Sequence, residues 1–164
     1  MHADEAAFGT VRGMPLAVVL VPGQVAREFR LRDGGGLEAE VYRPCTVEAC
    51  PDLPDPLEYH DGPYPAVVTF HGGASRKELH WWSSQPLAEA GYLVIAFDSE
   101  GLGPVVDEAE VVVDWLFESG DPLVAEFDGR RLGVAGHSAG GVVVSEFGHT
   151  DPRVDAVVSW DRAQ

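Results

Sequence analysis

Lysine is nearly absent from this chain. Of its 11 basic residues, Lys77 is the one lysine, and 27 acidic residues give a net charge of −16. A surface with this charge repels phosphate backbones and anionic lipids, so we expect neither nucleic acid nor a membrane as a partner. The acidity fits a salt-tolerant protein or, the simpler interpretation, ordinary solubility, and it carries no information about catalysis.

Long hydrophobic runs are also missing. The longest one near the start, residues 15–22, is far shorter than the roughly 20 residues that cross a bilayer. It makes a poor secretory signal as well, because Asp4 and Glu5 stand where such a signal needs positive charge. The sequence therefore predicts no membrane span and, by default, a cytoplasmic location.

Cysteine is scarce, with only Cys45 and Cys50 in a proline-rich stretch. Their spacing suits a small disulfide-closed loop or two free thiols, and the redox compartment decides between these alternatives. A zinc site would need two further ligands close by, and only His60 lies in the neighbourhood. We therefore expect no metal site here.

What is present fits one globular domain over residues 1–164, of which 45% are hydrophobic. Residues 28–32 and 37–42 alternate polar and apolar side chains around an Asp-Gly-Gly-Gly turn, which predicts a β-hairpin. Residues 44–65 are rich in proline and acidic residues and predict a loop.

From residue 66 onward, short apolar runs alternate with segments of helical periodicity. We predict buried strands at 66–70, 92–97, 131–135 and 154–160, and helices at 77–90, 107–118 and from 139 to about 148. The alternation indicates βαβ units. It predicts an α/β fold with a mostly parallel sheet, extended at one edge by the antiparallel hairpin.

The segment Gly136-His137-Ser138-Ala139-Gly140 has the pattern G-x-S-x-G between a predicted strand and a predicted helix. A serine at such a sharp turn exposes its hydroxyl, and the flanking glycines avoid collisions with the strand and helix beside it. The backbone N–H of Ala139, at a helix N-terminus, would point to a developing oxyanion. We therefore predict Ser138 as a nucleophile, against the alternative of a helix-capping serine.

His71-Gly72-Gly73 directly follows the first buried strand of the parallel sheet. Glycines allow this loop to approach a substrate carbonyl and to present a second backbone donor, from Gly72 or Gly73. The alternative is a plain strand-to-helix loop. Because both glycine-rich loops follow carboxyl ends of central strands, we expect them to converge on one site.

The order of these motifs resembles the α/β-hydrolase superfamily, with His71-Gly72-Gly73, the F-D-x-x-G-x-G segment at 97–103 and the Ser138 motif each following a strand. Within it, the chain is most similar to the dienelactone-hydrolase, chlorophyllase and polyester-hydrolase-like branch. The resemblance implies a three-layer fold and a serine esterase with a Ser-Asp-His triad. It also implies an acyl-enzyme intermediate, a small-molecule ester substrate and no cofactor.

The triad is where the sequence departs from the superfamily, in which the acid and then the histidine follow the serine. The one later histidine, His149, ends the next predicted helix and is poorly placed as a base. Asp161 follows the last strand and is the candidate acid, although an ordinary strand-end aspartate is the simpler interpretation. We expect His71 to shape the oxyanion loop and the side chain of His137 to point away from the nucleophile.

The sequence therefore predicts a chain truncated before the last strands of the fold. Its last strand would form a hydrophobic edge through which copies self-associate. Two other functions stay open: a non-catalytic α/β-hydrolase-like module, and a lactone or C–C bond hydrolase that uses the same site. Trp81 and Trp82 either line an acyl pocket or, as we expect, belong to the core.

Overall fold

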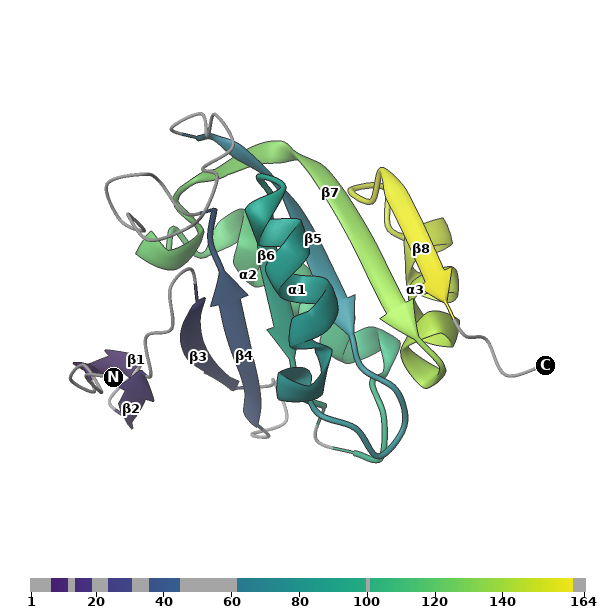
Figure 1. Cartoon of the computed structure of the whole chain (residues 1–164), viewed down its shortest axis with the longest axis horizontal. Helices are drawn as coiled ribbons and strands as arrows, with labels where there is room; N and C mark the ends of the chain where they lie inside the picture. The colour runs from purple at the N-terminus through teal and green to yellow at the C-terminus, as the bar shows by residue number, and fades with distance from the viewer. Residues whose placement is uncertain are drawn as a thin grey trace.

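The computed structural model describes residues 7–11, 14–18, 24–30, 36–44, 62–99 and 101–160, the first three ranges by their backbone alone. A six-stranded sheet has the order β3-β4-β6-β5-β7-β8 (Figure 1). Its strands are β3 Gln24–Arg30, β4 Gly36–Tyr42, β5 Tyr64–Phe70, β6 Leu93–Phe97, β7 Phe127–His137 and β8 Ala156–Trp160. A two-stranded hairpin, β1 Ala7–Val11 and β2 Met14–Val18, was not predicted.

Helices cover both faces of the sheet, which gives three layers (Figure 1). The short 3-10 helix η1 Lys77–His80 leads into α1 Trp81–Glu89 on one face, while α2 Val106–Glu118 and α3 Ala139–Thr150 pack on the other. A second 3-10 turn, η2 Pro122–Val124, precedes β7. No helix in the described part of the chain is both long and apolar enough to cross a bilayer.

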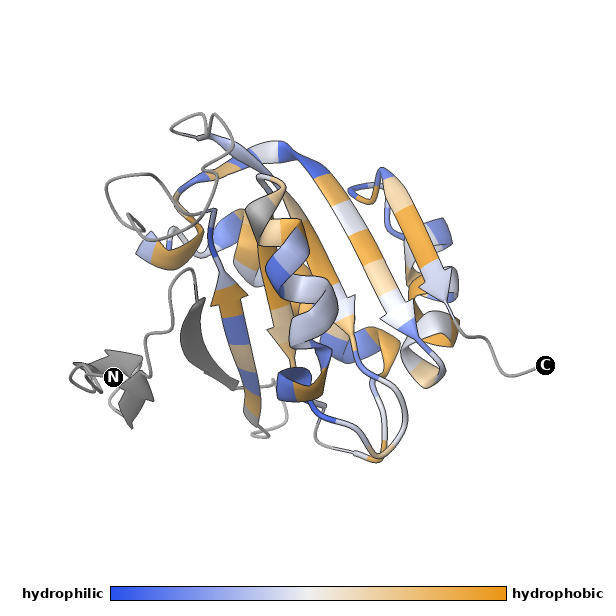
Figure 2. Ribbon diagram, viewed as in Figure 1, coloured by the Kyte–Doolittle hydropathy of each residue, from blue (hydrophilic) through white to orange (hydrophobic). Residues whose placement is uncertain are grey.

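The predicted sheet is confirmed. Strands β6, β5, β7 and β8 are parallel, and β3 and β4 form the antiparallel hairpin at the edge. β4 joins the parallel strands through antiparallel pairing with β6. Both strands are strongly hydrophobic (Figure 2), and the cause is the expected one, because all five residues of β6 are buried and β5 is buried from Ala66 to Phe70, the polar Thr69 included.

The last strand, β8, lies at the edge of the described sheet and pairs with β7 alone among the described strands. Val157 and Val158 are 37% and 53% exposed there. Val158 lines an apolar hollow of about 470 Å³ that opens over β5, β7 and β8 and is also lined by Val67 and Ala135. The apolar edge is as expected, and self-association through it stays a prediction.

Strand order fixes where a site can form. The chain runs from β5 through α1 to β6 on one side, and then through α2 back to β7 on the other side of β5. The direction of winding therefore reverses between β5 and β7. In parallel sheets the crevice outside the carboxyl ends of such strands is where ligands bind.

Candidate functional site

Ser138 lies at the turn between β7 and α3, in a backbone conformation that is rare for residues other than glycine. Its φ of 51° and ψ of −113° place it outside the ordinary allowed regions, at a cost of about 1–3 kcal/mol. Although Ser138 occupies the N-cap position of α3, its side chain makes no capping hydrogen bond. The strained turn was predicted, and the capping alternative is not supported.

The glycines on either side of Ser138 are required by close backbone packing. A Cβ on Gly136 would collide with the Gly140 carbonyl and lie 2.8 Å from the Gly141 nitrogen. A Cβ on Gly140 would collide with the Phe70 carbonyl and lie 2.6 Å from the His71 carbonyl oxygen. The start of α3 therefore rests directly on the end of β5, and the serine turn lies against the loop that follows β5.

We call residues 71–76, between β5 and η1, the oxyanion loop, after the role that the sequence predicts for it. A Cβ on Gly72 would lie 3.4 Å from Ser138 Cβ, and one on Gly73 would lie 3.9 Å from Ala139 Cβ. The loop is tied to the segment after β6, because the Ala74 N–H donates to the Leu102 carbonyl. The structure therefore brings together Gly72, Gly73, Ser138 and Ala139, as the sequence predicted.

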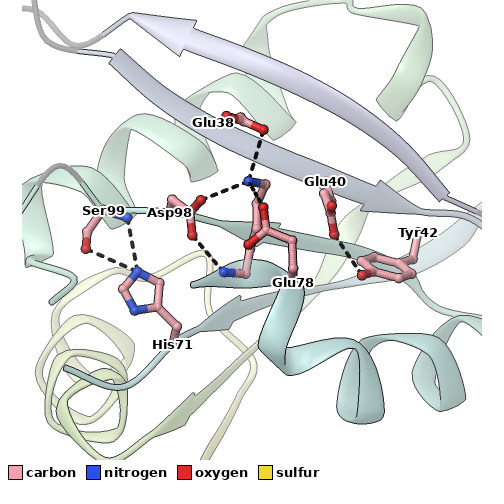
Figure 3. Close-up of polar contacts among 8 residues, drawn as sticks. Glu38, Glu40, Tyr42, His71, Glu78, Asp98 and Ser99 are labelled. Atoms are coloured by element: carbon pink, nitrogen blue, oxygen red, sulfur yellow. Dashed lines mark hydrogen bonds and ion pairs between the residues drawn. The ribbon is translucent and has the colours of Figure 1, made fainter. Parts of the chain in front are cut away.

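His71 fixes the start of the oxyanion loop through both ring nitrogens. Nδ1 lies 2.7 Å from the Gly72 carbonyl oxygen, and Nε2 lies 3.1 Å from the Ser99 backbone nitrogen, a contact drawn in Figure 3. Since the Ser99 N–H can only donate, Nε2 accepts and Nδ1 carries the proton. The expected role of His71 in shaping this loop is confirmed, and its ring nitrogens are engaged there.

The sole lysine of the chain anchors the other end of the oxyanion loop. The Lys77 ammonium lies 2.8 Å from Asp98, 2.8 Å from Glu78 and 3.0 Å from Glu38, three carboxylates that point toward it (Figure 3). The Lys77 backbone N–H donates to the other Asp98 oxygen at 2.7 Å. The loop is thus held to β4 and to the end of β6.

Burial governs the electrostatics of Lys77, whose side chain is 1% exposed. Burial by itself lowers the pKa of the ammonium, but the hydrogen bonds that it donates to Asp98, Glu78 and Glu38 outweigh this effect and raise the pKa. Burial disfavours the charged form of Glu78 too, which by itself would raise the pKa of that carboxyl. The hydrogen bond from Lys77 and other contacts outweigh burial, so the pKa of Glu78 is lowered. Both groups are therefore charged at neutral pH.

Replacing Lys77 with methionine should destabilise the protein by roughly 2 kcal/mol. Breaking a buried ion pair costs 3–5 kcal/mol, but Glu38 and Glu78 are 60% and 51% exposed and can turn to water. Urea unfolding measures the change. Arg131→Met is the matched control, because its ion pair with Asp128 is exposed on the arginine side and should contribute less than 1 kcal/mol. Equal losses in the two variants would contradict a special role for Lys77.

A cavity of about 280 Å³ opens at Ser138. Its size suits a short acyl group, at the lower end of small-molecule sites. It is lined by Gly72, Gly73, Ser75, Leu79, His80, Trp82, His137 and Ser138. Ser138 and the oxyanion loop therefore line one cavity together with the rings of His80, Trp82 and His137.

Two expectations about this cavity were wrong. His137 does not point away from the nucleophile: it lines the same cavity, because strand alternation places it on the α1 face and Gly72 leaves room for its ring. Trp81 and Trp82 are not core residues, being 59% and 48% exposed. Trp82 lines the cavity and packs edge-on against Trp160, with ring centroids 5.8 Å apart.

Sequence reasoning missed His80. It lies on η1, is 5% exposed, and its ring centroid lies 5.7 Å from that of His137. Its pKa is lowered, first by burial and then by the neighbouring His137 and His71. One signal in the sequence could have indicated it. His80 follows closely after the Gly72-Gly73 segment, and a single 3-10 turn between them brings the chain back to the site.

The remaining candidates lie elsewhere. His149 is exposed on the last turn of α3 and contacts the Ser145 carbonyl on the same helix, so it is no base for Ser138, as expected. Asp161, Cys45 and Cys50 fall outside the described residues. Within the described ranges, no group of three or more histidine, cysteine, aspartate or glutamate side chains is arranged to hold a metal.

The fold and the strained serine turn together define an α/β hydrolase. The chain belongs to the family described as Serine aminopeptidase, S33, whose model matches residues 61–160. This establishes a hydrolase family in general. The narrower dienelactone-hydrolase-like branch and the early chain end stay predictions.

Individual relatives agree with this class. The chain is 30% identical to the hydrolase LUC6 of Fusarium sp over 156 residues, covering 87% of this chain and 35% of that protein. It is 25% identical to the 2,6-dihydropseudooxynicotine hydrolase of Paenarthrobacter nicotinovorans, covering 80% and 41%. The chain thus spans less than half the length of these curated relatives.

Solved structures show the same fold. A 2,6-dihydroxy-pseudo-oxynicotine hydrolase matches with a TM-score of 0.63 at 23% identity, over 83% of this chain and 36% of that one. A brefeldin A esterase, described as a bacterial homologue of human hormone sensitive lipase, matches with a TM-score of 0.55 at 22% identity, over 82% and 38%. At these identities the likeness concerns the fold.

Proposed function

We propose that the chain carries the nucleophile and oxyanion-binding half of a serine esterase. Ser138 Oγ attacks the acyl carbon of a carboxylic ester, and the serine proton passes to a base from outside the described residues. The alcohol leaves after protonation, and water then releases the acid from the acyl-enzyme. The observation that carries the proposal is the strained, uncapped Ser138 beside the oxyanion loop, at a cavity of acyl size.

Oxyanion stabilisation falls to backbone N–H groups in this proposal. The Ala139 N–H opens α3, where the helix dipole favours negative charge, and Gly73 lies beside it with Gly72 next along the loop. Removing one such donor in a protease costs about 10²–10³ in rate, so the position of the loop decides reactivity. The anchors at His71 and Lys77 would hold that position before substrate binds.

A fluorophosphonate probe tests the proposal directly, because it forms a covalent bond to an activated serine. We expect slow labelling of the 164-residue chain, with the adduct mapped by peptide mass to Ser138. Ser145→Ala should label as the wild type does, since Ser145 on α3 donates to the Gly141 carbonyl and serves as a matched serine. No adduct, or an adduct elsewhere, would contradict the proposal.

A non-catalytic binding module is the second candidate, and one observation favours it. The residues that line the cavity include no acid that could orient His80 or His137 as a base, and His71 is committed to its loop. A serine without a base is a weak nucleophile at neutral pH. We therefore expect the isolated chain to hydrolyse p-nitrophenyl esters barely above background, and a total absence of probe adduct would favour the module.

A further inference from the structure

His80 places an incompletely satisfied imidazole at the wall of the Ser138 cavity. The side chain is 5% exposed and lines the cavity together with Leu79 and Trp82. Its Nδ1 is enclosed and has no hydrogen-bond partner among the described residues. A buried polar atom without a partner costs stability, and a phenyl ring of similar shape would avoid that cost. An imidazole kept here at that cost therefore indicates a use for its other ring nitrogen, Nε2.

The protonation state of the ring follows from its surroundings. Burial lowers the pKa of His80, and the nearby His137 and His71 lower it further, so the ring is neutral at neutral pH. A neutral imidazole has a single N–H, on either Nδ1 or Nε2. Since a buried acceptor is more readily left unpaired than a buried N–H, the proton lies on Nε2. With Nδ1 enclosed, the Nε2 side of the ring is the part that a ligand in the cavity can reach.

We propose that His80 is a substrate-binding residue that donates a hydrogen bond from Nε2–H to an acceptor oxygen on the acyl group. The preferred esters would carry an ether, hydroxyl or keto oxygen close to the scissile carbonyl. Leu79 and Trp82 give this part of the cavity apolar walls, so the rest of the acyl group is apolar and, in about 280 Å³, short. The inference rests on the proposed role of Ser138 as nucleophile.

Boronic acids test the substrate preference at equilibrium, because boron takes the place of the acyl carbon and bonds reversibly to the serine oxygen. Methoxymethylboronic acid and propylboronic acid differ by one oxygen in place of a methylene. We expect the 164-residue chain to bind the first more tightly, and His80→Phe to reduce that preference by about 3–10-fold, as for one neutral hydrogen bond. Calorimetric titration of each variant gives the ratio of dissociation constants.

Two amide variants separate a donor role from a structural one. His80→Gln places an N–H near the position of Nε2 and should keep most of the preference. His80→Asn places its amide near Nδ1 and should lose the preference as His80→Phe does. An unchanged ratio in both His80→Phe and His80→Asn would overturn the inference while leaving the role of Ser138 intact. If neither boronic acid binds, or if Ser138→Ala binds both equally well, the proposed function fails and the inference fails with it.

Stability provides a further readout. Because His80 has a lowered pKa when folded, the unfolded chain binds the proton more readily, and stability falls as the pH drops below about 6.5. His137 and His71 are the charged or titratable neighbours that contribute to this shift. His80→Phe should flatten this part of the pH profile and raise the melting temperature at pH 5.5. A lower melting temperature at that pH would show that the ring serves packing.

Discussion

Replacing Ser138 with glycine should abolish fluorophosphonate labelling and, at the same time, stabilise the protein by about 1 kcal/mol. The serine holds a φ of 51°, and relief of such strain contributes about 1–3 kcal/mol, of which glycine returns roughly 0.5–1 kcal/mol as chain entropy. Urea unfolding and mass spectrometry on the same preparation measure the two effects.

Ser138→Ala is the matched control for this experiment. Alanine keeps a Cβ at the positive φ, so labelling should disappear without any gain in stability. If alanine and glycine stabilise the protein equally, the cause is the loss of the hydroxyl and not the backbone. If the glycine variant is less stable than the wild type, the turn is not strained, and a main argument for a functional serine is lost.

Gly140→Ala should destabilise the protein by about 3 kcal/mol or more. The added Cβ meets the Phe70 and His71 carbonyls, which are backbone atoms at the end of β5 and cannot rotate away. Overpacking of this kind costs 1–3 kcal/mol even where side chains can adjust. Since His71 begins the oxyanion loop, the shift should also slow labelling of Ser138 beyond what the lost stability explains.

Gly133→Ala is the control for this substitution. Gly133 lies on β7, and a Cβ there meets its nearest atom, Val67 Cγ2, at 3.7 Å, an ordinary contact. We expect its free energy of unfolding to stay within about 0.5 kcal/mol of the wild type. Comparable losses at Gly133 and Gly140 would show that close packing at the serine turn is not what requires glycine.

Much of the fold could be predicted because its signals are local. The buried strands β5 and β6 are short, mostly apolar runs, and the hairpin of β3 and β4 alternates around a glycine-rich turn. Strand-helix alternation then predicts the parallel sheet. The Ser138 turn was predictable for the same reason, since its glycines are dictated by contacts that the motif encodes.

The surroundings of Ser138 were harder to predict because they depend on long-range packing. Lys77 contacts Glu38 on β4 and Asp98 just after β6, and no short motif links these residues. His80 reaches the cavity only because η1 turns back toward the end of β7. Trp82 was predicted to be a core residue because the sequence does not reveal that the sheet is open beside β8. His137 was misplaced because the turn was considered without the alternation along β7.

Trapping an acyl group on Ser138 tests the central claim most directly. The chain is incubated at length with p-nitrophenyl butanoate, denatured in acid and mapped by peptide mass. Our account predicts one butanoyl group on the peptide that contains Ser138, and none in Ser138→Ala. Nitrophenol release above background without an adduct on that peptide, or with equal release from Ser138→Ala, would contradict it.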